Sequence, residues 1–445
     1  MSSKEKAIII GGGISGKLAA RVLSDYYNEI IIIERDQKPE GPFPRKGAPQ
    51  GEHLHALLHA GEYGLEELFP DITEKFYSSG AININSTIDL SWFHHGSWKV
   101  RFDGGYRTTL QTRPHLEWHI EQYMKKIPNV TIQYNQIVQD YLYNKAENRI
   151  IGVELKTGSL RADLVVDESG VSSLTSSWMN KRGISIPSEK VDIDLSYISK
   201  QFELNNHHER DWKIKMIYPN PPQEKIGGTI SKVEGNRYIV TLMGYHGAIN
   251  EKEVLKGDRG FIELSKKLPI LDIYQEIKEA KPLSKTSIYR IPTIIWRRFD
   301  KIGNLPNGLL LIGDTICRID PVFGQGMSIA ILEALSLQKL LQQHKNELHK
   351  IPRFFHKKSA SIISPIWNMV ITEDYRYPAT TGKKPYGLTL QQWYAKNIFI
   401  LSSQNQDVYD NFVKVMNLVS PVSSLMKPSI IKNVLTHAFS KNSKS

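Results

Sequence analysis

Three glycines near the start of the chain have the spacing of a dinucleotide-binding turn. Gly11 would permit a tight turn, Gly13 would let a pyrophosphate approach the main chain, and Gly16 would let a helix pack closely on the preceding strand. An apolar run at 7–10 predicts that strand, and the first N–H groups of the following helix attract phosphate. The pattern therefore predicts a phosphate site formed by Gly11, Gly13, Ile14, Ser15 and Gly16.

An acidic residue stands where a ribose would lie. Glu34 ends a second apolar run, at 30–33, and comes 18 residues after Gly16. A carboxylate at that strand tip can accept hydrogen bonds from ribose hydroxyls. Because no basic residue takes its place, we expect an adenosine ribose without a 2′-phosphate, as in FAD or NAD(H), with Arg35 as a further contact. The alternative is a structural βαβ unit that binds no ligand.

A second corner of the same kind lies far along the chain. A buried run at 308–312 ends in Gly313 and Asp314, and a loop then leads into a strongly periodic helix. The β-rich sequence between the two corners implies that one long ligand is held from both ends of the chain. The candidate contacts here are Gly313, Asp314, Pro321, Gly324, Gln325, Gly326 and Met327.

Other polar residues could assist at these corners. Arg45, in a Pro/Gly-rich loop, and Arg113, at a predicted helix start, could neutralise a phosphate. His53 and His55 are two residues apart and share a face only on an extended segment. No further ligand is evident near them, so no metal site is predicted. His53, His55 and Tyr289 are candidate acid–base or orienting groups, with ordinary packing or main-chain bonding as the alternative.

The whole composition is that of a globular protein with room for two or three domains. Of its 445 residues, 40 % are hydrophobic and 23 % are charged, and the net charge is +11. The basic residues form no nucleic-acid motif, so a lysine-rich solvated surface, or attraction of anionic ligands, explains the charge. The single cysteine, Cys317, excludes an intrachain disulfide. No signal peptide and no apolar run of the ~20 residues that cross a bilayer is found, so a cytoplasmic protein is expected.

A third motif lies between the two corners. A buried run ends at Asp167 and passes through Glu168 and Ser169 to Gly170, and Asp167 and Gly170 are counted among the candidate cofactor contacts. With this motif in place, the chain resembles the FAD-dependent monooxygenases of the p-hydroxybenzoate hydroxylase type, whose three motifs occur here in order. More narrowly, it is similar to a bacterial branch of polyprenyl-methoxyphenol-hydroxylase-like proteins and polyether epoxidases. That branch carries stretches like 49–58 and 373–378, so the match spans essentially the whole chain.

The resemblance implies FAD as cofactor and NADPH or NADH as a transient electron donor. It implies that Asp314 binds the ribityl hydroxyls, and that Arg45 and Arg113 reach the pyrophosphate or the flavin edge. The loop at 321–327 would place N–H groups at the flavin N1/O2 locus. Relatives usually carry arginines after the middle glycine. Val171, Leu174 and Ser177 fill that region here, which weakens the expectation for the nicotinamide donor more than for the flavin.

The fold that follows is an α/β fold: a Rossmann-like FAD-binding domain with an inserted antiparallel β-sheet substrate domain and a helical C-terminal region. Period-two alternation between 191 and 243 predicts the antiparallel sheet. Alternation at 98–102 before Asp103-Gly104-Gly105 predicts a hairpin turn there. The expected boundaries are 1–80, 113–185 and 291–345 for the FAD-binding domain, 81–112 and 186–290 for the substrate domain, and 346–445 for the helical region. The apolar and basic stretch 426–441 is either a docked helix or a peripheral membrane contact.

The activity implied by the resemblance is that of a monooxygenase in which a flavin C4a-hydroperoxide hydroxylates or epoxidises an apolar aromatic, polyene or polyketide-type molecule of secondary metabolism. Its partners would be O₂ and a small substrate, free or carrier-bound. An FAD-dependent reductase or desaturase of a polyprenyl-like substrate is the main alternative, and a non-catalytic flavin-binding protein is another. A halogenase would be expected to show a Trp-x-Trp-x-Ile-Pro segment, which the chain lacks. Aromatic residues that suit an apolar substrate are Trp92, Phe93, Trp98, Tyr197, Phe202, Trp212 and Tyr218.

Overall fold

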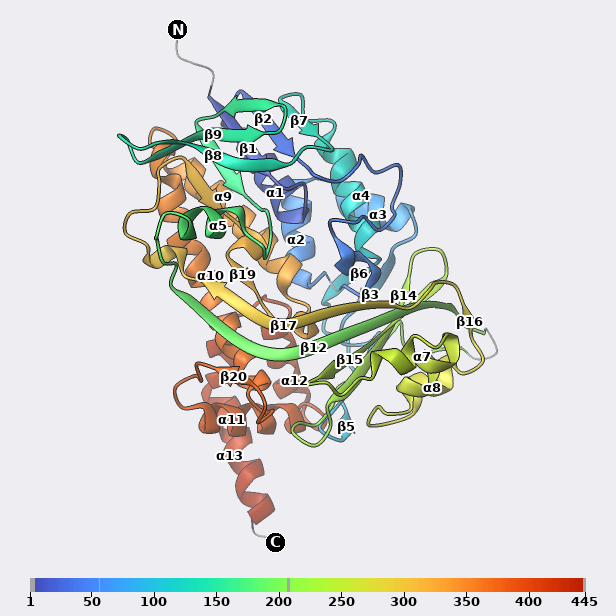
Figure 1. Ribbon diagram of the computed structural model, residues 1–445. Helices are drawn as coiled ribbons and strands as arrows, with labels where there is room; N and C mark the ends of the chain where they lie inside the picture. Colours follow the sequence, from blue (N-terminus) through green and yellow to red (C-terminus); the bar gives the residue numbers. More distant parts are fainter. Residues whose placement is uncertain (1–4, 56, 206–208, 443–445) are drawn as a thin grey trace.

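The computed structural model describes residues 5–55, 57–205 and 209–442. Ala56, within the stretch 49–58, and residues 1–4, at the N-terminus searched for a signal peptide, lie outside the described residues, as does the chain after 442. Within the described residues, no helix is long and apolar enough to cross a membrane. Two large sheets, two smaller ones and their helices make up the described chain, with the C-terminal helices at one end (Figure 1).

A parallel sheet of five strands forms the first layer of the described chain. Its runs of isoleucine, leucine and valine are buried on both faces, as parallel strands covered by helices require. The carboxyl ends of these strands meet at one edge, so the segments that follow them are brought together. The order is β18 (Leu309–Leu311), β11 (Leu164–Asp167), β1 (Lys6–Ile10), β2 (Glu29–Ile33), β7 (Val130–Gln133).

Helices cover this sheet and tie its segments to one another. Lys17 of α1 and Glu121 of α4 form a buried ion pair at 3.1 Å, and α9 packs against α1 and α10. The helices of this layer are α1 (Ile14–Leu23), α2 (His59–Leu68), α3 (Ile72–Ser78), α4 (Arg113–Met124), α5 (Leu174–Asn180), α9 (Gly326–Gln343) and α10 (Ile351–Asp374). A small antiparallel sheet next to β11 contains β8 (Val138–Asn144), β9 (Arg149–Leu155) and β10 (Gly158–Arg161).

A larger sheet of ten strands in the described chain forms the second layer. It is antiparallel apart from the parallel pair β4/β13. Its path is β19 (Cys317–Arg318), β17 (Ser287–Arg297), β12 (Ser188–Glu203), β15 (Arg237–Tyr245), β14 (Ile226–Val233), β13 (Ile214–Ile217), β4 (Leu90–His94), β5 (Ser97–Trp98), with β16 (Lys281–Pro282) and β20 (Thr381–Gly382) beside β12. The short helices α6 (Glu251–Val254), α7 (Asp258–Ser265) and α8 (Asp272–Ile277) pack on it. The α/β class with parallel and antiparallel sheets is thus confirmed.

Four details of the second layer and its neighbours differ from the sequence prediction or refine it. The hairpin turns at His95 and Gly96, both with positive φ, and not at Asp103-Gly104-Gly105. The backbone N–H of Val100 donates to the carbonyl of Ser402, at the end of the C-terminal helix α11 (Leu388–Leu401), and not to a neighbouring strand. The alternation of apolar residues at 98–102 therefore reflects packing between the sheet and the C-terminal helices. β17 also continues across the predicted boundary at 290/291, and β3 (Ile82–Asn85) pairs with β6 (Arg107–Leu110) outside the large sheet.

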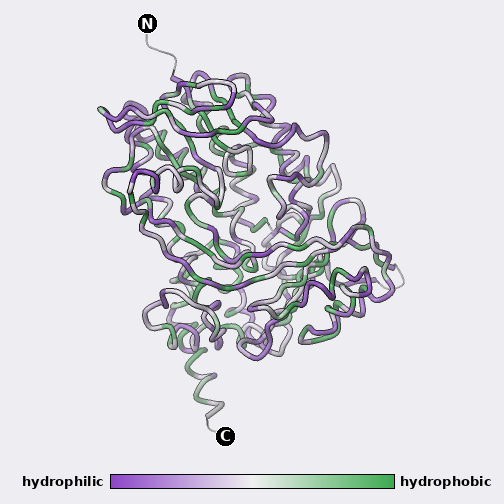
Figure 2. The backbone as a smooth tube through the Cα atoms, viewed as in Figure 1, coloured by the Kyte–Doolittle hydropathy of each residue, from purple (hydrophilic) through white to green (hydrophobic). Residues whose placement is uncertain are grey.

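The C-terminal helices pack against the β4 end of the large sheet. Their apolar residues form one cluster with Trp92 and Tyr106, and the hydropathy-coloured trace shows the last helix extending away from the body (Figure 2). That helix, α13, buries Ile430 and Val434 and exposes Leu435 and Phe439. The helices are α11 (Leu388–Leu401), α12 (Gln406–Met416) and α13 (Pro428–Asn442).

Candidate functional site

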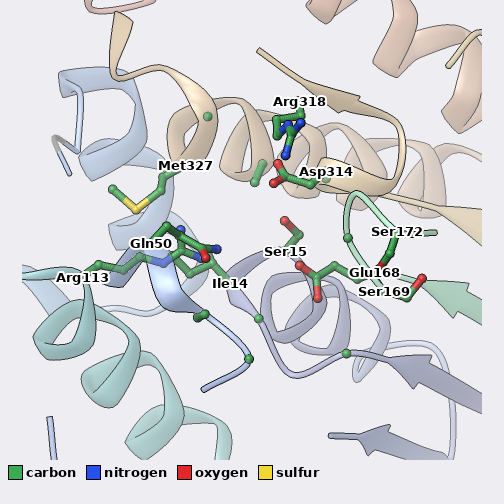
Figure 3. Close-up of a pocket in the computed structure, with 18 of the residues that line it drawn as sticks. Ile14, Ser15, Gln50, Arg113, Glu168, Ser169, Ser172, Asp314, Arg318 and Met327 are labelled. Atoms are coloured by element: carbon green, nitrogen blue, oxygen red, sulfur yellow. The ribbon is translucent and has the colours of Figure 1, made fainter. Parts of the chain in front are cut away.

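A cavity of about 470 Å³ lies where the carboxyl ends of the parallel strands face the large sheet. The two sequence corners, distant along the chain, line this one cavity (Figure 3). Of the predicted residues, those that line it are Gly11, Gly13, Ile14, Ser15, Glu34, Arg35, Arg45, His53, His55, Arg113, Gly170, Tyr289, Gly313, Asp314, Pro321, Gly324, Gly326 and Met327. Gly16, Asp167 and Gln325 do not line it.

The first corner is the turn from β1 into α1. Gly11 has φ +102°, a conformation that other residues rarely adopt, and a Cβ on Gly16 would overlap the carbonyl oxygen of Gly11. Gly16 thus serves the packing of the helix on the turn. The Glu34 carboxylate accepts hydrogen bonds from the backbone N–H of Gly12 at 2.8 Å and of Asp36 at 2.9 Å. Glu34 therefore also braces the turn whose ligand it was predicted to hold.

Two arginines of the cavity wall belong to a network of carboxylates. Arg45 donates to Glu34 at 3.3 Å, to Asp36 at 3.0 Å and to Glu117 at 3.1 Å, and Arg113 donates to Glu117 at 2.6 Å. Burial opposes ionisation of Glu117, but Arg113, Arg45 and the nearby Lys17 hold its pKa at about 2. The predicted phosphate-binding arginines are thus fixed in position by carboxylates before any ligand arrives.

The second corner is braced from behind by α9 and α10. Gly313 has φ +65°, and its N–H donates to Glu333 at 3.1 Å, while Ser359 donates to the other oxygen of Glu333 at 2.5 Å. Asp314 faces the cavity beside Arg318 (Figure 3). Burial raises the pKa of the Asp314 carboxyl, and Arg113 and Arg318 oppose that rise. A polar carboxyl group at this point can accept hydrogen bonds from ligand hydroxyls.

The loop from Pro321 to Met327 is held by the large sheet. Tyr245 donates to Asp320 at 2.7 Å, and Tyr218 donates to the carbonyl of Val322 at 2.7 Å. α9 begins at Gly326, where an added Cβ would meet no atom within 4 Å. The open side of Gly326 and the unpaired N–H groups of the helix start therefore leave space for a ligand. Gln325 lies behind them, fully buried, and its side-chain amide has no partner in the described chain.

The middle motif, residues 167–170, fixes the loop that follows β11. Asp167 is fully buried and accepts bonds from the N–H groups of Ser169 at 2.8 Å and Thr175 at 3.0 Å, which fixes the loop after β11. Arg297, from β17, donates to the carbonyl of Val171 at 2.5 Å and to that of Thr315 at 3.0 Å. A guanidinium from another strand thus ties this loop to the second corner.

The candidate acid–base groups lie at the large-sheet side of the cavity. His53 Nδ1 lies 2.8 Å from Ser199 Oγ, and its ring centre lies 6.1 Å from that of Tyr197 and 5.9 Å from that of Tyr289. Burial lowers the pKa of His53 to about 4, and burial together with Arg113 lowers that of His55 to about 3. Both imidazoles are therefore neutral at pH 7 and can orient a polar group without carrying charge.

Residues that the sequence did not single out complete the wall. Glu168 and Arg318 line the cavity with ionisable groups, and Gln50 lines it from the loop before His53. The position of Glu168 directly after a strand of the sheet was the available signal. Among the aromatic residues expected to meet substrate, Tyr197 lines the cavity, Tyr218 bonds the loop, and Trp98 is 37 % exposed. The others pack in apolar clusters: Trp92, Phe93, Phe202 and Trp212.

In the described ranges, no group of three His, Cys, Asp or Glu side chains is arranged to hold a metal ion. Cys317 lines the cavity, and burial raises its pKa well above that of a free thiol. The cavity offers hydrogen-bonding and ionic groups along its length, which fit a long dinucleotide such as FAD.

Comparison with known proteins places the fold. No family model matches the chain. The Mycobacterium tuberculosis protein Rv3254 is 27 % identical over 396 residues, which cover 85 % of this chain and 82 % of that protein. PqsL, a probable FAD-dependent monooxygenase from Pseudomonas aeruginosa, superposes with a TM-score of 0.65 at 14 % identity and covers 84 % of this chain and 97 % of its own.

Two further solved structures have a similar fold. The flavin-dependent brominase Bmp2 matches with a TM-score of 0.68 at 15 % identity, over 98 % of this chain and 99 % of its own. The p-nitrophenol 4-monooxygenase PnpA from Pseudomonas putida DLL-E4 matches with a TM-score of 0.66 at 16 % identity, over 93 % and 99 %. The chain therefore has the fold shared by these flavin-dependent monooxygenases and halogenases.

Proposed function

We propose that the protein is an FAD-dependent monooxygenase that hydroxylates or epoxidises a small apolar molecule, with NADPH or NADH as electron donor. One observation supports this above all others: the corner at 11–35 and the corner at 313–327 line a single cavity. Their sequence patterns independently predict the two ends of one dinucleotide. A fold shared with flavin-dependent oxygenases and halogenases is consistent with that cofactor.

The residues of the wall have distinct tasks in this proposal. The start of α1 would bind the pyrophosphate, Glu34 would accept from a ribose hydroxyl, and Asp314 would accept from the ribityl chain. The start of α9 would offer N–H groups and positive potential to the flavin ring. Bound FAD, once reduced, would supply the activation of O₂.

The large-sheet side would position the substrate. Tyr197, Tyr289 and Ile291 present apolar surface at the cavity, and His53 contributes a neutral imidazole held by Ser199. Such a wall excludes water and offers few hydrogen bonds. It therefore favours an apolar aromatic, polyene or polyketide-type substrate with one polar group that can hydrogen-bond to His53.

Purified protein tests this directly. It should be yellow or should become yellow with added FAD, and it should oxidise NADPH or NADH faster in the presence of its substrate. Asp314→Leu should lose FAD, whereas Glu154→Gln, at an exposed carboxylate that does not line the cavity, should retain it. A colourless protein that FAD cannot reconstitute would rule out the proposal.

Labelled oxygen separates the remaining activities. Incorporation of ¹⁸O from ¹⁸O₂ into the product is expected for hydroxylation or epoxidation. A reduced or desaturated product without label would instead identify an FAD-dependent reductase or desaturase of a polyprenyl-like substrate.

A further inference from the structure

The carboxyl group of Glu168 lies on the glycine turn itself. A Cβ built on Gly13 would lie 2.7 Å from Glu168 Oε1 and 2.9 Å from Oε2, and one on Gly11 would lie 2.6 Å from Oε2. Glycine at these positions is what lets a pyrophosphate approach the main chain. Figure 3 shows the Glu168 side chain pointing toward the start of α1, near Ser15. The space predicted for phosphate thus holds a carboxyl group.

The backbone fixes Glu168 at this place. Its N–H donates to the carbonyl of Ile10, the last residue of β1, at 2.9 Å. The residue before it, Asp167, is paired in register with Ile10. The main chain of Glu168 therefore cannot move away from the turn without breaking the parallel ladder, whereas its side chain can rotate.

The side chain has no partner that would keep it ionised. In the described part of the chain, its carboxyl group makes no hydrogen bond and no ion pair. The charged groups that face it are Arg45, Arg113, Glu34 and Asp314. The guanidinium of Arg45 is engaged by three other carboxylates and that of Arg113 by Glu117. Glu168 is thus an acid beside two other acids, with the nearby cations committed elsewhere.

We propose that the Glu168 side chain controls cofactor affinity: its carboxyl group holds the pyrophosphate position in the cofactor-free chain, and FAD binds when this group is protonated or has rotated away. The inference rests on the proposed function, because it takes the pyrophosphate to be that of FAD. An ionised carboxylate repels the pyrophosphate at this short range, whereas a protonated one can donate a hydrogen bond to a phosphate oxygen.

Affinity for FAD should therefore depend on pH in a specific direction. Burial, reinforced by Asp314 and Glu34 and opposed by Arg45, raises the pKa of Glu168 to about 8. Below that value the group is neutral and binding is strong. Above it, the dissociation constant should rise by at most about tenfold per pH unit, as linkage to one proton requires.

The dissociation constant of FAD can be measured by quenching of flavin fluorescence at pH 6.5, 8 and 9.5, for the wild type, Glu168→Gln and Glu168→Ala. We expect the wild-type dissociation constant to rise at least about tenfold from pH 6.5 to 9.5. Glu168→Gln, which is nearly isosteric and cannot ionise, should change little over that range and bind about tenfold more tightly than the wild type at pH 9.5. Glu154→Gln should follow the wild type.

Two further probes locate the effect on the pyrophosphate. ADP-ribose, which carries a pyrophosphate and no flavin ring, should displace FAD with the same dependence on Glu168. Riboflavin, which carries no phosphate, should bind all variants equally. Thermal unfolding of each variant checks that the fold is retained.

The outcomes are distinguishable. Weaker binding by Glu168→Gln would mean that the carboxylate accepts from a ligand hydroxyl, and it would overturn the proposal. So would identical pH profiles of the wild type and Glu168→Gln while both bind FAD. If no variant binds FAD at any pH, the proposed function fails as well, and this inference fails with it.

Discussion

Asp320 and Asp374 are buried against each other and hydrogen-bond through their carboxyl groups, although no basic side chain of the described chain pairs with either. Asp320 also accepts from the N–H of Val322 at 2.8 Å and from Tyr245 at 2.7 Å, while one oxygen of Asp374 has no partner. Two buried carboxyl groups without a cation must share a proton. This pair joins the end of α10 to the loop before Pro321.

Protonation of the pair should make stability fall as pH rises. Burial and Asp320 raise the pKa of Asp374 well above its usual range, so the folded protein keeps a proton that the unfolded chain releases near pH 4. From there up to the folded pKa, the free energy of unfolding should decline by at most about 1.4 kcal/mol per pH unit. Asp374→Asn, which still donates to Asp320, should abolish that decline.

Urea unfolding at several pH values between 5 and 8 measures the free energy of unfolding of the wild type and of Asp374→Asn. If the free energy of unfolding varies with pH in the same way for the wild type and for Asp374→Asn, the pair holds no shared proton. The neighbouring titratable groups, which both proteins retain, are Tyr197, Tyr218, Tyr245, Tyr377 and Glu373.

Removal of the Arg45 guanidinium should destabilise the fold. Arg45→Leu would leave Glu34, Asp36 and Glu117 with less compensating charge in a largely buried place, at a cost of about 2–3 kcal/mol in the free energy of unfolding. Arg45→Lys should recover only part of this, because one ammonium cannot bridge three carboxylates. Arg35→Leu, whose guanidinium makes one long hydrogen bond, is the control and should stay within about 0.5 kcal/mol. A loss of similar size for Arg35→Leu would argue against the network.

The His53 ring should remain neutral across the physiological range. Since burial lowers its pKa to about 4, its ring proton resonance should not shift between pH 5.5 and 8 in an NMR titration. Comparison with Ser199→Ala and with His53→Gln assigns the signal. A midpoint near 6.5 would mean that the imidazole is exposed and available as a cationic acid.

Substitution of Gly16 should strain the first corner. A Cβ there would overlap the carbonyl oxygen of Gly11, which belongs to the backbone and cannot rotate aside. Gly16→Ala should therefore destabilise the protein by about 1–3 kcal/mol, as overpacking does. Gly303→Ala, where the added methyl group meets no atom within 4 Å, should be nearly neutral in the same unfolding experiment. Equal stability of the two variants would contradict the close approach.

The backbone structure of the two corners could be predicted from the sequence because the signals for it are local. A strand, a glycine turn and a helix start are specified by neighbouring residues, and both corners of the chain line one cavity. The direction in which a side chain points after a strand is not specified in that way. Asp167 and Glu168 are adjacent acids, yet Asp167 turns inward to the loop while Glu168 faces the cavity.

Contacts between segments that lie far apart in the chain could not be predicted from the sequence patterns. The bond from Arg297 to Val171, the bracing of Gly313 by Glu333 and the pairing of Asp320 with Asp374 each join segments whose separation carries no periodicity. The hairpin was also misplaced, because His95 adopts the positive φ that was expected from glycines further along. Tertiary packing decides these features, and local propensity does not.

The long ladder between β12 and β17 has a consequence for recombination of this protein with others. It runs from Ser188 paired with Arg297 to Ser199 paired with Ser287, with a shift of register between Asp192 and Leu195 (Figure 1). One end of this ladder pairs with β19, next to the second corner, and at the other end β12 continues into the rest of the large sheet through β15. A chimaera that exchanges the large sheet must therefore cross over within both strands at matched positions, or it will bring residues of the other protein into the wall of the cavity.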